Sequence, residues 1–489
     1  MNKRVVAAWT VFLASLLAWL PSSSIIKLII ENDPVVLGRY SVGHFGALLL
    51  LTIVLWIAAA VLFSTRKKSV GETIFALVMV YLSAGLSSFV LVVGSGMINK
   101  PRFVEQPISG VDPDTGIVLS GIVRHRPPNE RFDLLQKDVP EQMRSYPNAP
   151  AGYPEFPLVL TSDARGYRNH DALQKYDVVA VGDSFVAGSH VSDNQAWVDL
   201  LRQRTGKTIY NLGVSGSDPL TYLNNFITVG RAFKPKTVLV MLYEGNDFRD
   251  APPVPTAANT ASVPATENRS QSLGFYAKAS PVTKGLRRLA TETLAAVGAD
   301  SPVSGYAEQV GFMPVMVEAN GTKHAYSFEP KRLRYLVDAS EQEFAASSDW
   351  SNVRDVLDRF VLLSKKDGFR LIFVYAPSTP HVIFPLVEKN IPAQQLLNFV
   401  NIGRKKPVEV DANTYKQQVF ARLDANENTW KQWCAAQSIE CISTTKALQQ
   451  AAAKQQVYYS YDQHWTPQGN AVTAQVIEDY LRAFPRELF

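Results

Sequence analysis

Three residues of this chain have the types and settings needed for nucleophilic catalysis, although they lie far apart in the sequence. Ser184 follows the apolar run Asp177–Val181, and Asp462 precedes His464 by two positions. A serine hydroxyl is a weak nucleophile at neutral pH, so it needs an adjacent base that a third group orients. We therefore predict that Ser184 is the nucleophile, that His464 is the general base and then the acid, and that Asp462 orients the imidazole. The competing interpretation is that Ser184 only caps the helix that follows it.

His464 is one of seven histidines, and its setting distinguishes it from the others. It lies just before Thr466-Pro467, a pair typical of the start of a helix. The segment Ala471–Leu481 should then form a helix that packs on a sheet and holds the histidine in place. Most of the other histidines lie in irregular segments, where a solvated imidazole is the default.

Two further blocks carry groups that could stabilise an oxyanion. They are Asn211–Gly216 and Glu244–Asp247, and each follows its own apolar run. Together with the blocks around Ser184 and His464, they resemble the four sequence blocks of the SGNH (GDSL-type) hydrolase superfamily, in the same order. The resemblance extends from about Thr161 to the C-terminus.

The resemblance implies which groups bind the oxyanion of a tetrahedral intermediate. They are the backbone N–H groups of Ser184 and Gly216 and the side-chain amide of Asn246. Gly216 would let the backbone approach the substrate closely, and Asn246 would be a neutral donor at the end of a strand. The alternatives are that Gly216 only turns a loop and that Asn246 only caps a helix.

Two departures from the usual pattern of the superfamily point to one of its branches. Many members place the acid three residues before the histidine, where this chain has Tyr461. Many also place a glycine two residues before the asparagine, where this chain has Glu244. The resulting Asp-x-His-Trp arrangement resembles the branch of alginate O-acetylation proteins, which act on exopolysaccharide outside the cytoplasm. Asp247 is the second choice for the acid of the triad.

Apolar runs that alternate with helical patterns predict an α/β fold. The runs are short and rich in β-branched residues, as in strands buried on both faces of a parallel sheet. Right-handed crossovers then give a three-layer α/β/α domain, which the resemblance makes flavodoxin-like. The predicted strands are Asp177–Val181, Thr208–Leu212, Thr237–Leu242, Arg370–Tyr375 and Ile439–Ser443. The predicted helices are Trp197–Arg204, Tyr222–Phe233, Trp350–Lys366 and Ala471–Leu481.

The N-terminal part of the chain has the composition of a membrane anchor. It carries three long uncharged apolar runs: Val5–Ile26, Phe45–Phe63 and Thr73–Ile98. About 20 apolar residues span the hydrocarbon core of a bilayer, so we predict three transmembrane helices, with a cleaved signal peptide as the alternative for the first. The basic pair Lys3-Arg4 and the group Arg66–Lys68 then belong on the cytoplasmic side. This predicts a multi-pass inner-membrane protein whose catalytic domain lies on the periplasmic side.

These features divide the chain into three parts. Residues 1–100 form the membrane anchor, 101–160 a tether with accessory strands, and 161–489 the catalytic domain. An insertion at about 250–348 opens with a Pro-, Ala- and Thr-rich stretch that we expect to be mobile, and Lys284–Leu294 within it has a helical pattern. A second excursion runs from Pro380 to about Asn413. Each excursion is either a lid or acceptor-binding wall beside the site, or a surface decoration with no role in the chemistry.

Charge and cysteine content exclude several classes of function. Residues 1–100 carry eight Lys/Arg and three acidic residues, which accounts for the net charge of +5 and leaves the remainder neutral, so nucleic-acid binding is not expected. Cys434 and Cys441 make a poor zinc site, and they form either a local disulfide outside the cytoplasm or two buried thiols. Without a glycine-rich phosphate loop after a strand or a ligand cluster, neither cofactor nor metal is expected.

The sequence therefore predicts a serine esterase or O-acyltransferase that removes or transfers an acyl group, acetyl first, on a cell-envelope or exported polysaccharide. Both reactions share an acyl-enzyme on Ser184, and they differ in whether water or a sugar hydroxyl releases it. A transferase would need a multi-spanning partner, because acetyl-CoA is cytoplasmic and three helices resemble an anchor more than a channel. The alternatives are a non-catalytic glycan-binding scaffold of an export complex and a lipid esterase.

Overall fold

The computed structural model describes residues 9–15, 48, 51–57, 103–140, 150–170, 173–249, 252–254, 312–319 and 321–485. The chain divides into two units, one of residues 1–101 and 267–300 and the other of residues 102–266 and 301–489.

In the first unit, residues 9–15 and 51–57 are helical, and Nε1 of Trp56 donates to Oγ of Ser15 at 3.1 Å. None of the helices among the described residues combines the length and the apolar character needed to cross a membrane. The three predicted transmembrane runs lie largely outside the described residues, so they stay a prediction.

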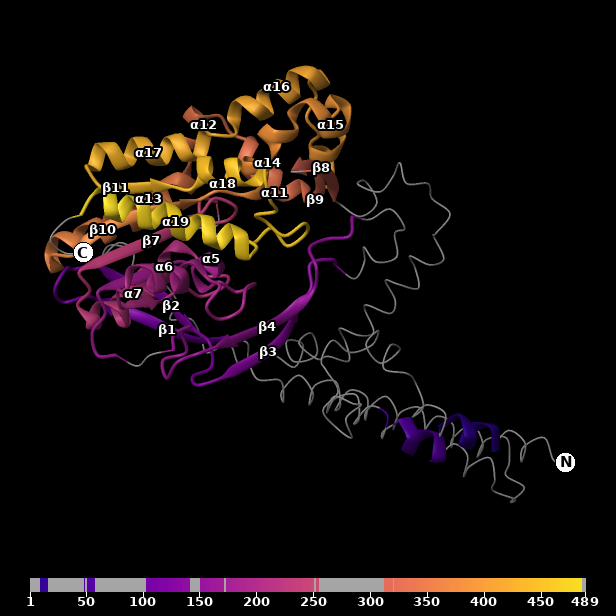
Figure 1. The fold of residues 1–489 in the computed structure, drawn as a ribbon, viewed down its shortest axis with the longest axis horizontal. Coiled ribbons are helices and arrows are strands. Elements are labelled where there is room, and N and C mark those ends of the chain that lie inside the picture. Colours follow the sequence, from indigo (N-terminus) through magenta and orange to yellow (C-terminus); the bar gives the residue numbers. More distant parts are fainter. Residues whose placement is uncertain are drawn as a thin grey trace. The chain divides into compact units, whose positions relative to one another are not determined.

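The second unit is built on a five-stranded parallel sheet (Figure 1). Its strands are β5 (Val178–Val181), β6 (Ile209–Asn211), β7 (Thr237–Tyr243), β10 (Arg370–Ala376) and β11 (Glu440–Ser443). They lie in the order β6-β5-β7-β10-β11, and every neighbouring pair is parallel. Counted along the chain this is the flavodoxin-like order 2-1-3-4-5, in which ligands bind where the order reverses, at the carboxyl ends of the first and third strands. The predicted α/β class with a parallel sheet is confirmed.

Helices cover both faces of this sheet because its strands are apolar on both. Val178 and Ala180 of β5 belong to one buried cluster, and the alternate residues Val179 and Val181 belong to the other. The first cluster takes residues from α6 (Trp197–Thr205), α14 (Thr379–Val387), α18 (Thr445–Ala452) and α19 (Pro467–Ala483). The second takes residues from α7 (Pro219–Thr228), α13 (Ser348–Asp367) and α17 (Ala425–Gln437). The unit therefore has the three layers that the sequence predicts.

The helix boundaries follow from their caps. The helix predicted at Tyr222–Phe233 begins earlier, because the side chain of Asp218 accepts the N–H of Thr221 and Pro219 occupies the first turn. It also ends earlier, and Gly230–Phe233 forms a separate 3-10 turn, η2. The long helix α13 ends at Asp367, and the following Gly368 has φ +76°.

The stretch predicted as a tether is part of the folded unit. β1 (Val104–Val111) pairs with β2 (Val118–His125), and β3 (Arg131–Gln136) pairs with β4 (Phe156–Thr161), both antiparallel. Two side-chain amides of α7 fix β2 in place. Nδ2 of Asn224 donates to the carbonyl of Ser120 at 2.8 Å, and Nδ2 of Asn225 donates to that of Arg124 at 3.0 Å.

The described part of the predicted insertion packs on the domain. An antiparallel hairpin of β8 (Met313–Ala319) and β9 (Thr322–Phe328) is followed by α11 (Pro330–Val337) and α12 (Glu341–Ala345). Phe328 is buried against Phe384 of α14, with 4.9 Å between ring centroids. The Pro-rich opening, apart from residues 252–254, and the helical pattern at Lys284–Leu294 lie outside the described residues. The second excursion forms α14, η5 (Glu388–Asn390), α15 (Ala393–Asn401) and, past its end, α16 (Ala412–Arg422).

The two cysteines are joined. A disulfide connects Cys434 of α17 to Cys441 of β11, and their Cα atoms are 6.3 Å apart. Of the two alternatives left open by the sequence, the structure has the local disulfide. It ties the end of a helix to the edge strand of the sheet.

Candidate active site

The proposed nucleophile occupies the first position of a short helix at the carboxyl edge of the sheet. This helix, α5, spans Ser184–Ala187 and follows β5 after one turn. Its cap is Asp183, whose carboxylate accepts the N–H of Phe185 at 2.9 Å. The turn is tight, since a Cβ on Gly182 would lie 2.4 Å from the side chain of Val186. The capping role that competed for Ser184 is therefore filled by its neighbour.

The structure brings Ser184, His464 and Asp462 into one hydrogen-bonded series. Nε2 of His464 lies 2.7 Å from Oγ of Ser184, and its Nδ1 contacts Oδ1 of Asp462. The side chains of His464 and Asp462 are 20% and 27% exposed, so solvent reaches both. Burial alone would raise the pKa of Asp462, but the imidazoles of His464 and His190 and the hydrogen bonds from His464 lower it below its usual range. Asp462 is thus an anion that can stabilise a protonated His464.

Asp462 and His464 belong to a loop of residues 457–466, here called the Asp-His loop. Its ends are joined by the N–H of Thr466, which donates to the carbonyl of Val457 at 3.0 Å. Gln463 lies in the left-handed region with φ +68°, which is uncommon for a residue with a side chain and is typical of functional sites. Thr466 caps α19, as the sequence predicts, by accepting the N–H of Gly469.

A buried carboxylate outside the predicted motifs fixes the Asp-His loop. Asp138 is 5% exposed. It accepts the backbone N–H groups of Ser460, Tyr461 and Asp462 at 2.7, 2.9 and 3.1 Å, and that of Tyr153 at 2.7 Å. Burial raises the pKa of Asp138, and these N–H groups offset part of the rise. Sequence reasoning missed this residue, because it lies in the stretch that was predicted to be a tether.

A second imidazole stacks on the proposed base. The ring centroids of His190 and His464 are 4.1 Å apart, with 25° between the ring planes. Nδ1 of His190 lies 3.6 Å from Oδ1 of Asp462 and 3.2 Å from Oε1 of Gln136. Phe185 also stacks on His464, with centroids 4.9 Å apart. Two aromatic contacts therefore define the plane of the His464 ring.

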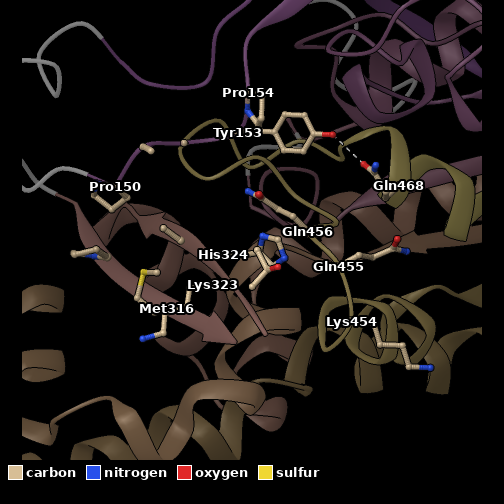
Figure 2. Close-up of a pocket in the computed structure, with 15 residues that line it drawn as sticks. Pro150, Tyr153, Pro154, Met316, Lys323, His324, Lys454, Gln455, Gln456 and Gln468 are labelled. Atoms are coloured by element: carbon tan, nitrogen blue, oxygen red, sulfur yellow. Dashed lines mark hydrogen bonds between the residues drawn. The ribbon is translucent and has the colours of Figure 1, made fainter. Parts of the chain in front are cut away.

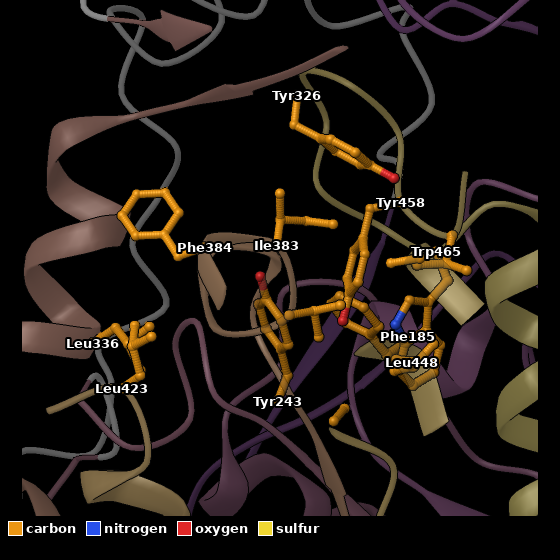
Figure 3. Packing of buried hydrophobic residues seen from close by; sticks show 14 of the residues in the cluster. Phe185, Tyr243, Tyr326, Leu336, Ile383, Phe384, Leu423, Leu448, Tyr458 and Trp465 are labelled. Carbon is orange, nitrogen blue, oxygen red and sulfur yellow. The ribbon is translucent and has the colours of Figure 1, made fainter. Parts of the chain in front are cut away.

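Phe185 connects the site to the core beneath it. Its ring stacks on Tyr243 at 4.0 Å between centroids and meets Trp465 edge-on at 4.8 Å. Figure 3 shows these rings together in the buried cluster, next to Tyr458. The residues that flank Ser184 and His464 in sequence thus pack against each other below the polar groups.

An arginine fixes the segment that carries His190. Arg168 is buried, and its guanidinium donates to the carbonyls of Ala187 and Val191 at 3.0 and 2.9 Å. Its Nε donates to Oδ1 of Asp193 at 2.9 Å. Charge-assisted bonds of this kind are stronger than neutral ones, so the loop after α5 is held firmly.

The predicted oxyanion groups lie on neighbouring loops of the same sheet edge. Asn246 follows β7, and its side chain hydrogen-bonds to Asp183, next to Ser184. Gly216 lies in the loop after β6 with φ +71°, and its carbonyl accepts Nη1 of Arg124 at 2.6 Å. The strand order places these loops on either side of the turn after β5. The role of both residues as hydrogen-bond donors to an oxyanion stays a prediction.

Asp247, the second choice for the triad acid, has other partners. It is buried, and it accepts the hydroxyl of Tyr222 at 2.9 Å and the N–H of Tyr243 at 2.8 Å. Burial and the nearby Asp183 raise its pKa well above the usual value. Burial likewise raises the pKa of Asp183 to about 6, although the N–H of Phe185 and the charge of His464 lower it.

Glu244, the other departure from the usual pattern, belongs to an ion network in which Glu244 and His381 are buried and the side chain of Asp424 is 69% exposed. Nδ1 of His381 lies 2.9 Å from Oε1 of Glu244, and its Nε2 lies 2.9 Å from Oδ1 of Asp424. Glu244 also accepts the N–H and the hydroxyl of Ser378 at 2.8 and 2.7 Å. Burial would lower the pKa of His381, but Glu244, Asp424 and Glu427 raise it to about 10. His381 is therefore a cation at neutral pH.

Two groups of described residues bring possible metal ligands within 4.8 Å of one another: His190 with Asp462 and His464, and His381 with Asp424 and Glu427. In each group, hydrogen bonds already engage the same atoms. Nδ1 of His464 contacts Asp462, and Nε2 of His381 contacts Asp424. The two clusters are accounted for as hydrogen-bonded networks.

The C-terminal part of the chain matches a known family. Residues 402–487, which include Asp462 and His464, match the family described as "SGNH hydrolase-like domain, acetyltransferase AlgX". This confirms the resemblance to the superfamily and to its AlgX branch. No curated protein sequence matches the chain.

Several solved structures are similar to this chain at low scores. A member of the lipolytic protein G-D-S-L family from Veillonella parvula is 10% identical, with a TM-score of 0.29, and the alignment covers 63% of this chain and 98% of that one. A GDSL-like lipase from Bacteroides thetaiotaomicron is 13% identical, with a TM-score of 0.23 and coverage of 63% and 87%. The acetyl xylan esterase Est2A from Butyrivibrio proteoclasticus is 9% identical, with a TM-score of 0.24 and coverage of 79% and 96%. We draw no conclusion about function from likenesses of this size.

Proposed function

Since the chain resembles the SGNH (GDSL-type) hydrolases and, among them, the AlgX acetyltransferases, we propose that it is a serine esterase or O-acetyltransferase acting on a cell-envelope or exported polysaccharide. One observation carries the proposal: Oγ of Ser184 lies 2.7 Å from Nε2 of His464, and Asp462 contacts the other ring nitrogen. A hydroxyl, a base and an orienting acid in this arrangement activate serine for attack on an ester carbonyl.

In the acylation step, Oγ of Ser184 attacks the carbonyl carbon of the ester while its proton passes to Nε2 of His464. Asp462 stabilises the imidazolium that forms. The negative charge that develops on the carbonyl oxygen accepts hydrogen bonds from the N–H groups of Ser184 and Gly216 and from the side-chain amide of Asn246. His464 then protonates the departing alcohol oxygen, which leaves an acetyl ester on Ser184.

Deacylation uses the same groups in the reverse direction. His464 takes a proton from water or from a sugar hydroxyl, and the freed oxygen attacks the acetyl carbon. The proton then returns to Oγ of Ser184 as its bond to the acetyl group breaks. Water gives acetate, and a sugar hydroxyl gives a new acetyl ester, so the nucleophile that reaches the acyl-enzyme decides between esterase and transferase.

The space between Ser184, His190 and His464 is small. Ser184, His190 and His464 line a cavity of only about 10 Å³. Ligand pockets for larger molecules measure roughly 300 Å³ or more. This cavity is too small to hold an acyl group, so it does not select between acetyl and longer chains.

We also propose that the site lies outside the cytoplasm, on a membrane-anchored chain. The charges that flank the three predicted transmembrane runs support this orientation. The disulfide between Cys434 and Cys441 supports it as well, because disulfides persist in oxidising compartments. A transferase would then require a multi-spanning partner that carries the acyl group across the membrane.

The test is acetate release from an activated acetyl ester by the full chain and by Ser184→Ala. Ser364→Ala, which changes a serine on α13, is the matched control. We expect the loss of activity only in Ser184→Ala, and equal rates in all three proteins would overturn the nucleophile. Adding an oligosaccharide acceptor separates the reactions: acetylated sugar formed at the expense of acetate indicates a transferase, and unchanged acetate release indicates an esterase.

A further inference from the structure

The stretch that was predicted to be a tether fixes the part of the site that carries the base. Asp138 binds three backbone N–H groups of the Asp-His loop and also that of Tyr153. The hydroxyl of Tyr153 in turn donates to Oε1 of Gln468 at 3.1 Å, which ties this stretch to the helix that follows His464 (Figure 2). Residues 103–160 therefore contribute to the geometry of the site, although they include none of the predicted reacting groups.

The same stretch also contacts a predicted oxyanion residue, through Arg124 of β2. Nη1 of Arg124 donates to the carbonyl of Gly216 at 2.6 Å. The side chain of Arg124 is 18% exposed: its guanidinium lies over the ring of Phe103, 4.4 Å from the centroid, and its Nε lies 3.3 Å from Oε1 of Glu105. Its backbone is fixed as well, because its N–H donates to Oδ1 of Asn225 and its carbonyl accepts Nδ2 of the same residue, both at 3.0 Å. Arg124 is therefore a firmly held donor to the loop after β6.

The orientation of Gly216 depends on such contacts. Gly216 is exposed and has φ +71°, and a glycine has no side chain whose packing could fix its backbone. The peptide unit after Gly216 is held on both sides: its C=O accepts Arg124, and its N–H, which belongs to Ser217, donates to the carbonyl of Val214 at 3.2 Å. The peptide unit before Gly216 carries the N–H that is predicted to bind the oxyanion. The two units share the Cα of Gly216, so the bond from Arg124 restricts the direction of this N–H.

We propose that Arg124 is a positioning residue for the oxyanion hole: it holds the carbonyl of Gly216 so that the N–H of Gly216 faces the oxyanion formed at Ser184. This inference rests on the proposed function and adds to it a residue outside the four sequence blocks that carry the resemblance. A preorganised donor stabilises the oxyanion without a cost of reorganisation. Its displacement therefore slows the chemical step more than it weakens the binding of the ester. The accessory strands then position both the base and an oxyanion donor.

The test compares Arg124→Met with Arg359→Met in the full chain. Methionine keeps an apolar stem over Phe103 but removes the donor. Nη1 of Arg359 on α13 donates to the carbonyl of Val118 in β2 at 2.9 Å, so the control removes an arginine–carbonyl bond from the same strand. In Arg124→Met we expect kcat for a small activated acetyl ester to fall about tenfold, less than the loss of roughly 10²–10³ for a whole oxyanion donor, with KM within about twofold. In Arg359→Met both constants should stay within about twofold of wild type.

Two further variants test how Arg124 acts. Arg124→Lys keeps the charge and a donor for the carbonyl of Gly216, so it should recover kcat to within about threefold of wild type. Gly216→Ala disturbs the same peptide units, because alanine is strained at φ +71° and its Cβ would lie 3.2 Å from Nη1 of Arg124. If the arginine acts through this glycine, Arg124→Met lowers kcat by less than about twofold in the Gly216→Ala background.

Three results would overturn the inference. One is a kcat of Arg124→Met equal to that of Arg359→Met. Another is an equal loss from Arg124→Met in the wild-type and Gly216→Ala backgrounds, because the effect would then not pass through the glycine. The third is an Arg124→Lys protein that folds and is no faster than Arg124→Met. If small-ester hydrolysis persists in Ser184→Ala, the proposed function fails; if it depends on Ser184 while Arg124→Met keeps the wild-type kcat, only the role of Arg124 fails.

Discussion

His464 and His381 both contact carboxylates near the carboxyl edge of the sheet, and their surroundings differ in one decisive respect. His464 is 20% exposed and has Asp462 on one nitrogen and the neutral hydroxyl of Ser184 on the other. His381 is fully buried and has a carboxylate on each nitrogen. Two carboxylate acceptors require both ring nitrogens to carry protons, whereas a hydroxyl can donate to a free lone pair.

This difference separates a base from a structural cation. His464 can accept a proton because one nitrogen faces a neutral donor, and solvent and substrate can reach it. His381 holds its proton because the carboxylates of Glu244 and Asp424 are close enough to outweigh the effect of burial, which by itself would lower its pKa. Glu244 lies two residues before Asn246, so the network also anchors the loop that carries a predicted oxyanion donor. Both residues are histidines, so the hydrogen-bond partners of their ring nitrogens decide which one is a base and which one is a structural cation.

Replacing His464 should have the largest effect. In His464→Gln the hydroxyl of Ser184 has no base, so we expect kcat/KM for an activated acetyl ester to fall about 10³–10⁴-fold, equivalent to roughly 4–5 kcal/mol. The side chain is partly exposed and replaced by a polar one, so the melting temperature should change little. Activity above one tenth of wild type would contradict the assignment of the base.

Replacing His381 should affect stability instead. His381→Gln leaves Glu244 and Asp424 without a cation, and breaking a buried ion pair typically costs about 3–5 kcal/mol. Urea unfolding measures this loss, and kcat/KM of the folded protein should stay within tenfold of wild type. A loss of stability below 1 kcal/mol would show that the network contributes little. A loss of activity without a loss of stability would show that His381 serves catalysis rather than stability.

The raised pKa of His381 predicts how the free energy of unfolding depends on pH. Its pKa is about 10 in the folded protein and about 6.5 when unfolded. A raised pKa stabilises the folded state fully below the unfolded value, and this contribution is lost as the pH rises through about 10. The free energy of unfolding of wild type should therefore fall between pH 7 and 10, and that of His381→Gln should fall less over the same range.

Asp138 should show an intermediate effect on activity. Asn at this position keeps the volume but replaces one acceptor oxygen by a donor that faces backbone N–H groups, so the Asp-His loop should shift. A displacement of about 1 Å at reacting groups can cost about 100-fold in rate, which we expect for kcat/KM of Asp138→Asn. Asp133→Asn, an exposed acid on β3, is the matched control and should stay within twofold. Equal rates for the two variants would remove Asp138 from the positioning of the loop.

Local signals explain why part of the site can be predicted from the sequence. Ser184 follows an apolar strand, and His464 precedes a cap and a proline, so a few adjacent residues mark each of them. The alternation of strands and helices predicted the parallel sheet and its three layers. Asp138 has no such signal: its contact with Ser460 spans 322 positions, and only the fold brings them together. His381 likewise acquires its charge from Glu244, just after β7, and Asp424, the cap residue of α17, and no spacing in the sequence reveals these contacts.

His190 should give the smallest effect, and it sharpens the comparison because it is about as exposed as His464 and lies near the same carboxylate. It is 21% exposed, stacks on His464 and lies 3.6 Å from the carboxylate that His464 contacts. If it acts by holding the plane of His464, His190→Phe keeps the stacked ring and should lower kcat/KM only about twofold, whereas His190→Ala should lower it about tenfold, equivalent to roughly 1.4 kcal/mol. His170→Phe, at an exposed histidine that does not line the Ser184 cavity, is the control. If Phe is as damaging as Ala, and the loss changes with pH, the nitrogens of His190 rather than its ring are required, and the site contains a second titrating base.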